Sequence, residues 1–347
     1  MNEYTSRSIA VRYVEHTRKK LFVVIVFLLA TLLASIYALN AGAERINIES
    51  LILALLNKGD VKVRTILWNI RLPRVMASIF AGAGLSVAGL IIQTLLRNPL
   101  ASPYTLGVSQ GAAFGAAAAI IAVGTGVNYS PYLVTACAFL GAITTSFIVL
   151  FLARLRGVTP EAMVLAGVAL GSLFQAATII LQYFANDVQL ASIVFWTFGD
   201  MGRASLLDLK IMAAVTLIAS VYFTLQLWNY NTIESGEETA KGLGVEVERV
   251  RFWGMVVVSL LAATIVSFLG IIGFVGLVGP HIMRRLLGTD HRFLIPGSGM
   301  AGAFLLLVSD TLARTVVSPV VLPVGAVTSF MGAPLFLYLL YRGFGKR

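Results

Sequence analysis

The sequence predicts an all-α integral membrane protein with about ten transmembrane helices, organised as a single domain over residues 1–347. Of its residues, 58% are hydrophobic and only 12% are Asp, Glu, Lys or Arg, whereas soluble domains carry about 25% charged residues. Uncharged runs recur along the whole chain, and a helix that spans a bilayer needs about 20 apolar residues. This composition rules out a soluble enzyme.

The first expected span is 21–40, which follows the cations Arg18, Lys19 and Lys20. The apolar core of a secretory signal is about 7–15 residues long, so this longer run favours a retained helix with a cytoplasmic N-terminus. The mixed polar stretch 44–74 then predicts an external loop.

Further uncharged runs predict the remaining spans. They cover 75–96, 100–130, 131–153, 162–186, 206–231 (interrupted by Asp208 and Lys210), 252–280, 293–309 and 324–341. As one helix, the run 252–280 would measure roughly 43 Å at 1.5 Å per residue, too long for one upright span and too short for two. We therefore expect one full helix followed by a broken half-helix.

The second half of that run has a glycine at every third position and ends in a proline, a pattern that weakens a continuous helix. Non-helical backbone at membrane depth is stable only against protein or a water-filled cavity. We therefore expect this segment to lie beside a pathway through the membrane, with Gly273, Gly276, Gly279 and Pro280 as its adjacent residues.

Small residues also recur at helical spacing elsewhere in the chain. They are Gly82, Gly84 and Gly89, Gly107, Gly111 and Gly115, and Gly167 and Gly171. Such ridges let helix backbones approach closely in lipid. Close helix packing and the lining of a substrate route both fit this pattern.

The 26 Lys and Arg residues test the topology of these spans. Loops taken alternately inside and outside place 17 of the 26 on the inside, together with both termini. The net charge of +10 is therefore mainly a topology signal and does not indicate a nucleic-acid partner. Six of the nine outside cations fall within the stretch 44–74.

The sequence contains few residues that could perform catalysis or bind a metal ion. There is no G-x-x-x-x-G-K-[ST] phosphate loop, so the chain is not expected to hydrolyse ATP. Two of the three histidines, His281 and His291, flank a basic loop, where solvated helix-end roles are expected rather than metal ligation. The single Cys137 excludes an intramolecular disulfide and a cysteine cluster. We expect no catalytic residue, metal or cofactor.

Two other classes of membrane protein need buried ionisable groups. A secondary carrier usually keeps intramembrane carboxylates for its coupling ion, and an intramembrane enzyme needs clustered His, Asp, Glu or Cys within its spans. Here only Asp208, Lys210 and Asp310 lie at the borders of apolar runs. A transport subunit that draws its energy from another protein is the preferred reading, and a secondary carrier is the alternative.

Eight motifs follow one another between residues 64 and 342. They are IRLPR at 70–74, RNPLASPYTLGVSQG at 97–111, LAGVALG at 165–171, GEETAKGLGV at 236–245, GFVGLVGPH at 273–281, GTDHR at 288–292, DTLAR at 310–314 and LPVG at 322–325. In this order they resemble the permease subunits of type II ABC importers for iron-siderophores, haem and cobalamin, the FecCD-type family.

The resemblance implies a ten-helix permease in the cell membrane, without enzymatic activity of its own. Its implied partners are a second permease copy, in a homodimer or a heterodimer, two cytoplasmic ATPase subunits and an extracytoplasmic substrate-binding protein. Arg71, Arg74 and Arg314 match outward arginines that receive carboxylates of the binding protein, a role that suits guanidinium forks. The alternative is that Arg71 and Arg74 only snorkel at a helix start.

The resemblance also assigns two cytoplasmic segments. Residues 231–251 match the ATPase-coupling loop, whose candidate residues are Gly236, Glu237, Glu238, Ala240, Gly242, Leu243 and Gly244. A plain solvated loop of mixed charge is the alternative. The turn at 157–161 matches a cytoplasmic gate, with Thr159 and Pro160 as candidates, although Pro160 and Glu161 stand where the family can carry hydroxyl residues.

The substrate is not fixed by these motifs, because importers of all three cargoes share them. An iron(III)-siderophore complex is the preferred substrate, and cobalamin or haem is the alternative.

Overall fold

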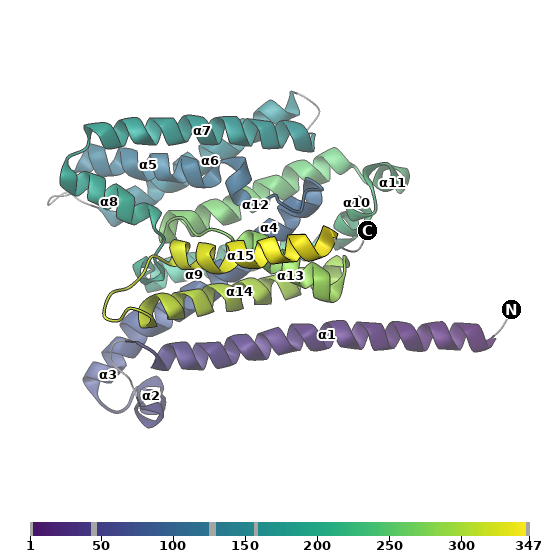
Figure 1. Cartoon of the computed structure of the whole chain (residues 1–347), viewed down its shortest axis with the longest axis horizontal. Helices are drawn as coiled ribbons and strands as arrows, with labels where there is room; N and C mark the ends of the chain where they lie inside the picture. Colours follow the sequence, from purple (N-terminus) through teal and green to yellow (C-terminus); the bar gives the residue numbers. More distant parts are fainter. Residues whose placement is uncertain (1–2, 43–46, 125–129, 156–158, 345–347) are drawn as a thin grey trace.

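The computed structural model describes residues 3–42, 47–124, 130–155 and 159–344, and every regular element in these ranges is helical (Figure 1). The helices are α1 Glu3–Asn40, α2 Ile48–Leu55, α3 Val61–Ile66, α4 Leu72–Leu95, α5 Val108–Val123, α6 Pro131–Arg154, α7 Pro160–Phe184, α8 Asp187–Thr197, α9 Leu206–Leu225, α10 Leu227–Glu234, α11 Glu237–Gly242, α12 Val247–Leu269, α13 Val275–Leu287, α14 His291–Thr315 and α15 Val324–Phe344. The long helices run side by side as one bundle. We call its two ends the α2 end, where α2 and α3 lie, and the α11 end, where α10 and α11 lie.

The predicted spans correspond to helices of the bundle. Within the described residues, seven helical segments are long and apolar enough to cross a membrane, and α5 and α15 are shorter apolar helices. With the half-helix α13 they give the expected ten, which confirms the all-α membrane fold. Along the chain the ten are α1, α4, α5, α6, α7, α9, α12, α13, α14 and α15.

The boundaries differ from the prediction in four places. Helix α1 begins at Glu3, far ahead of the expected 21, and the expected external loop contains α2 and α3. Helix α5 begins at Val108 instead of 100, because residues 103–106 form a 3₁₀ turn that ends at Gly107 with φ +74°. The run 206–231 divides into α9 and α10. Helix α8 was not predicted.

Helix α4 is the centre of the packing, with 19 of its 24 residues buried. It touches α14, α13, α12 and α9, and the contact with α14 and α13 is made backbone to backbone. A Cβ atom on Gly82 would collide with the carbonyl oxygen of Gly302 in α14, and one on Gly89 would collide with that of Gly276 in α13. Glycine is needed at these positions because no side chain fits between the backbones.

Most glycines of the other ridges pack in the same way, whereas the nearest atom to a Cβ on Gly171 would be 3.7 Å away. A Cβ atom on Gly111 or Gly115 would collide with backbone of α6, and one on Gly167 would collide with the carbonyl oxygen of Thr105. Close packing, rather than the lining of a route, therefore explains these positions.

The predicted helix break is present. Helix α12 ends at Gly270, where φ is +79°, residues 271–274 are not helical, and α13 starts after Phe274, which has φ +64°. Pro280 lies inside α13 and cannot donate to the carbonyl of Gly276, four residues earlier. That freed carbonyl instead accepts from Nε2 of Gln93 in α4, at 3.4 Å.

We predict that Gly89→Ala destabilises the protein, because the added methyl group meets backbone that cannot move aside. Overpacking of this kind costs about 1–3 kcal/mol or more. The midpoint of thermal unfolding in detergent should fall. Gly242→Ala is the matched control, since nothing lies within 4 Å of its Cβ position; equal midpoints for the two variants would contradict the packing argument.

Candidate functional site

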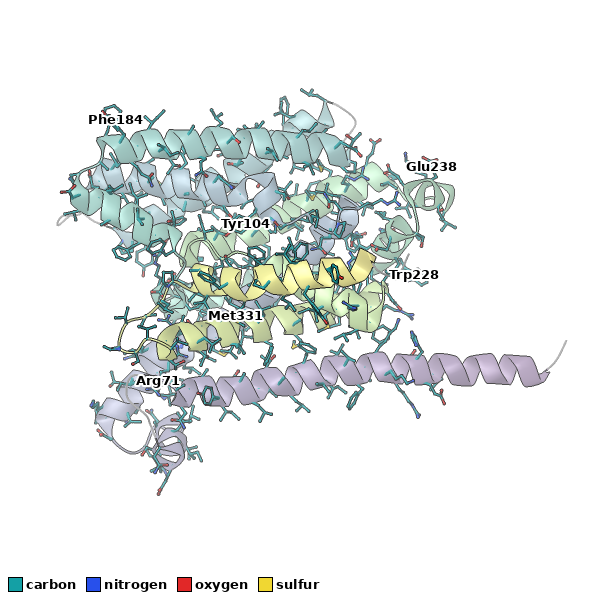
Figure 2. All side chains as sticks on the ribbon, viewed as in Figure 1. Arg71, Tyr104, Phe184, Trp228, Glu238 and Met331 are labelled. Carbon is teal, nitrogen blue, oxygen red and sulfur yellow. The ribbon has the colours of Figure 1, made fainter. Side chains whose placement is uncertain are left out.

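The helix break opens a cavity of about 580 Å³. Its walls come from the break itself, the turn at 103–105, the end of α8 and the start of α15, and Figure 2 shows Tyr104 about midway along the bundle. No charged side chain is among the described residues that line it. Its polar side chains are all hydroxyls: Ser102, Tyr104, Thr105, Ser109, Thr197 and Ser329. The other lining residues are apolar or glycine, and the hydroxyls of Thr105, Thr197 and Ser329 donate to carbonyls of their own segments. The cavity is therefore neutral and mainly apolar, with hydroxyl oxygens that can still accept hydrogen bonds.

The four glycine and proline candidates of the break separate into two pairs. Gly273 and Gly276 line the cavity. Gly279 packs against Ser86 of α4, and Pro280 is buried within α13. The geometry supports a pathway-adjacent position for the first pair and a packing role for the second.

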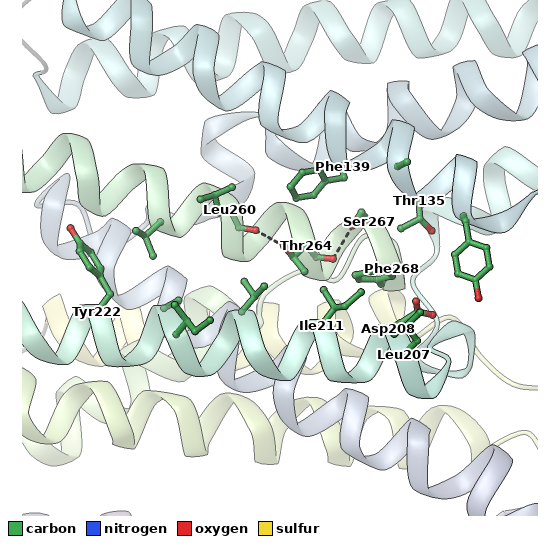
Figure 3. Close-up of a pocket in the computed structure, with 16 residues that line it drawn as sticks. Thr135, Phe139, Leu207, Asp208, Ile211, Tyr222, Leu260, Thr264, Ser267 and Phe268 are labelled. Atoms are coloured by element: carbon green, nitrogen blue, oxygen red, sulfur yellow. Dashed lines mark hydrogen bonds between the residues drawn. The ribbon is translucent and has the colours of Figure 1, made fainter.

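A second, larger cavity of about 710 Å³ lies between α6, α9 and α12 (Figure 3). Its lining is almost entirely apolar. The hydroxyl of Thr264 donates to the carbonyl of Leu260 at 2.8 Å, and that of Ser267 donates to the carbonyl of Thr264 at 2.9 Å. These hydroxyls are turned onto their own helix, as are those of Thr197 and Ser329 in the cavity at the break. The cavity between α6, α9 and α12 is the more apolar of the two, although Asp208 also lines it.

At the α2 end of the bundle two arginines, Arg74 and Arg314, bind one carboxylate, that of Asp310. Nε of Arg74 lies 2.8 Å from Oδ1 of Asp310, and Nε of Arg314 lies 3.1 Å from Oδ2. Nη2 of Arg74 also lies 3.0 Å from Oδ1 of Asp200. Asp310 is fully buried, so its charge is held by the two guanidinium groups.

Arg71 and Arg314 also bind the C-terminal carbonyls of α1. Nη1 of Arg71 donates to the carbonyls of Leu39 and Asn40 at 2.7 and 2.8 Å, and Arg314 donates to those of Ala38 and Ala41. The last carbonyls of a helix have no partner within it, so these bonds satisfy them. The arginines therefore tie α1, α4 and α14 together.

This arrangement corrects the expectation of an exposed arginine surface. Arg71 and Arg74 are 5% and 8% exposed and Arg314 is half-buried, because each finds acceptors within the chain. They do not snorkel either. The exposed member of the cluster is Asp200, whose side chain is 43% exposed. Asp310 and Asp200 were not predicted as site residues; the spacing of Asp310 and Arg314, four apart in one helix, was the available signal.

At the opposite end, α11 projects from the bundle, and Figure 2 shows Glu238 at its outer edge. Ala240 is buried and anchors the helix, whereas Leu243 is 68% exposed. Nothing lies within 4 Å of a Cβ on Gly242 or Gly244. Gly236 has φ +130° and Gly244 φ +83°, so glycine suits the turns on both sides of α11.

Glu237 attaches α11 to the membrane helices. Its carboxylate lies 3.0 Å from Nη2 of Arg251 and 3.5 Å from Nζ of Lys241, and Arg251 Nε donates to the carbonyl of Leu95 at the end of α4. Burial raises the pKa of Glu237, but the hydrogen bond and charge of Arg251 and the charge of Lys241 outweigh it, so the pKa is lowered. The attachment is therefore complete above the ordinary glutamate pKa of 4.5 and is lost only as the pH falls below it.

Thr159 and Pro160 begin α7. The Thr159 hydroxyl oxygen accepts from the N–H of Ala162 at 3.3 Å, and Pro160 is the first helical residue, so both have a capping role. Both line a cavity of about 460 Å³ together with Glu237 and Arg251 of the α11 attachment. Gly157 and Val158 of the expected gate lie outside the described residues.

The solvated role expected for His291 is wrong. The side chain is fully buried at the start of α14, between Thr94 of α4 and Asn231 of α10. His281 is half-buried and stacks edge-on against Phe336. Within the described residues no group of three or more His, Cys, Asp or Glu could hold a metal ion.

Comparison with known proteins identifies the family. The FecCD transport family model matches residues 28–342. The chain belongs to this family. The protein MJ0087 of Methanocaldococcus jannaschii, named as an ABC transporter permease, is 52% identical over 339 residues, which cover 95% of this chain and 97% of that protein.

Two other relatives are named after the substance that they transport. The hemin transport system permease protein HmuU of Yersinia pestis is 38% identical, over 79% of this chain and 82% of its own. The vitamin B12 import system permease protein BtuC of Klebsiella pneumoniae is 38% identical, over 95% and 96%. A solved inward-facing structure of a metal-chelate type ABC transporter superposes with a TM-score of 0.81 at 28% identity, over 93% of this chain and 99% of that one.

This FecCD protein is thus a multi-pass membrane permease of an ABC transporter, a transport component rather than an enzyme.

Proposed function

We propose that this FecCD permease imports an iron(III)-siderophore complex, which an external binding protein delivers and ATP hydrolysis by a separate subunit drives inward. The observation that carries the substrate class is the cavity at the helix break, which is neutral and mainly apolar and has six hydroxyl side chains in its wall. Iron(III) chelates present many oxygen atoms that such a lining can hydrogen-bond. Hemin and cobalamin, the cargoes in the names of two relatives, are the competing substrates.

The proposed partners follow from the two ends of the bundle. We assign the α11 end to the cytoplasm, with both chain termini, because short basic segments such as Arg284 and Arg285 lie there. Residues 231–251 then contact the ATPase through α11 as part of one permease domain, 1–347, in the cell membrane. A second copy, identical or homologous, completes the permease; the sparsely buried α7, with four buried residues of 25, has apolar surface for that contact or for lipid.

The binding protein docks at the α2 end, above Arg71, Arg74 and Arg314. Because Asp200 already lies beside Nη2 of Arg74 and is itself exposed, a carboxylate of the binding protein reaches Arg74 by taking the place of Asp200. Nη2 of Arg74 is buried and makes no hydrogen bond with good geometry in the described residues, so it has a donor to offer. Arg71 and Arg314 act by holding this end of α4 and α14 in place.

The first prediction concerns uptake. In proteoliposomes that contain the permease with its ATPase, and with the binding protein added outside, we expect ATP-dependent uptake of iron(III)-siderophore. Omission of either partner should abolish it. Uptake of hemin or cobalamin in its place would reject the siderophore assignment and keep the importer; uptake by the permease alone would reject the importer.

The second prediction concerns docking. Asp200→Asn removes the competing carboxylate, so the binding protein should dock more tightly by about two- to tenfold, most clearly at low salt. The control is Asp187→Asn, which removes another exposed carboxylate from the α2 end. Equal or weaker docking of the Asp200 variant in a pull-down would exclude Arg74 as the receiving group.

The third prediction concerns the ATPase contact. Leu243→Asp places a charge on the exposed tip of α11 and should weaken ATPase binding by about 30-fold, since a central apolar contact is worth about 2 kcal/mol. Leu56→Asp is the matched control, because Leu56 is 63% exposed at the other end of the bundle. Co-purification of the ATPase with both variants in equal yield would contradict this contact.

A further inference from the structure

A ring of polar side chains lies within the α11 end and joins four helices. Thr94 belongs to α4, Asn231 and Glu234 to α10, Arg284 to α13 and His291 to α14. Thr94 and His291 are buried. Buried polar groups are costly unless each finds a partner, so a closed ring at this depth holds its helices in one relative position.

The first arm of the ring runs through the histidine. Nε2 of His291 lies 2.9 Å from the Thr94 hydroxyl, and Nδ1 lies 2.9 Å from Oδ1 of Asn231. The same Oδ1 accepts the backbone N–H of His291 at 2.9 Å. An amide oxygen only accepts, so Nδ1 carries a proton and donates to Asn231. Helix α10 is thereby bound to both the backbone and the side chain of the first residue of α14.

The second arm runs through the arginine. Nη2 of Arg284 donates to the Thr94 hydroxyl oxygen at 3.0 Å, and Nη1 lies 2.5 Å from Oε1 of Glu234. The two arms start from neighbouring turns of α10 and converge on the single hydroxyl of Thr94, which also lies 3.0 Å from the carbonyl oxygen of Leu90 in its own helix. A longer hydrogen bond of 3.5 Å, from Nδ2 of Asn231 to Oδ1 of Asp290, adds to the histidine arm at the start of α14.

The side chain of Arg284 has room to adopt a second set of hydrogen bonds. Glu234 and Arg284 line a cavity of about 350 Å³ that Gln93 also lines. Nε of Arg284 and Oε1 of Gln93 are both buried and have no hydrogen-bond partner among the described residues. One is a donor and the other an acceptor, so a shift of Arg284 within this cavity can replace a bond to Thr94 or Glu234 by one to Gln93.

We propose that this ring transmits movement of α10 and α11 to α13 and α14, and so to the walls of the cavity at the helix break. The inference rests on the proposed ATPase contact at α11. Helix α10 leads directly into α11, and α13 begins at the break. Hydrogen bonds are directional, so a movement of α10 as a rigid body also displaces the helices that are bound to it. Apolar contacts are not directional, and apolar side chains can slide past one another. Thr94, Asn231, Arg284 and His291 are positioning residues for transport.

Thr94→Val tests the ring, because valine keeps the shape of threonine and removes the hydroxyl on which both arms converge. In proteoliposomes with the ATPase and binding protein, we expect ATP hydrolysis to change by less than about twofold, while substrate moved per ATP falls about tenfold, a typical coupling between sites. Thr94→Ser restores the hydroxyl and should restore the ratio. Thr232→Val is the control, since the Thr232 hydroxyl binds only carbonyls of its own helix.

Asn231→Ala is a second variant that cuts the histidine arm alone and should also lower the ratio. An unchanged ratio in Thr94→Val and Asn231→Ala overturns the proposal, as does a parallel loss of ATP hydrolysis and uptake, which a purely structural role would give. The ATPase contact is judged separately by Leu243→Asp, because that variant should lose the bound ATPase, whereas the ring variants should keep it.

Discussion

The close approach of the α4 backbone to α13 and α14 is the constraint on which the rest of the structure depends. In lipid there is little hydrophobic gain from pairing two apolar helices, so association relies on van der Waals contact over short distances. Glycine at Gly82 and Gly302, and at Gly89 and Gly276, allows that distance. The same close approach places the helix break at 271–274 and the start of α13 against the buried helix α4. The carbonyl that Pro280 leaves without an N–H partner is satisfied from α4 for the same reason.

Helix α4 also carries the polar group at the centre of each end of the bundle. Arg74 in its first turn is bound to Asp310 of α14, and Thr94 in its last turn is bound to His291 of the same helix and to Arg284 of α13. Breaking a buried ion pair by removing one partner costs about 3–5 kcal/mol. The glycine contacts fix how close the helices lie, and these polar contacts fix their register along the bundle axis.

The sequence was sufficient for features that depend on residues close together in the chain. Uncharged run length predicted the spans, and glycine spacing within an overlong run predicted the break at 271–274. It was not sufficient where a partner lies far away in sequence. The burial of Arg74 depends on Asp310, 236 positions later, and that of His291 on Thr94, 197 positions earlier. From the sequence alone, Arg74 was therefore assigned to a docking surface and His291 to a solvated helix end, because neither partner could be located. Helix α8 was missed because its 11 residues are too few to span a membrane, although the capping box of Asn186 and Gln189 marks its start.

The break separates two sets of hydrogen bonds that reach the cavity from opposite ends. On the α2 side, the N–H of Asp200 donates to the carbonyl of Leu269, and the N–H groups of Val324 and Gly325 donate to Gly199 and Phe198. These backbone hydrogen bonds connect Asp200 to the wall of the cavity on the α2 side. On the α11 side, α13 is held through Arg284.

Between these two sets of hydrogen bonds the chain passes through positive φ at Gly270 and Phe274, without helical bonds across 271–274. Since a hinge needs a few residues that absorb a change of backbone angle, this segment is where displacements of the two ends can differ. The cavity thus has walls on both sides of this segment, because Phe198 and Gly325 belong to the α2 side and Gly276 of α13 belongs to the α11 side.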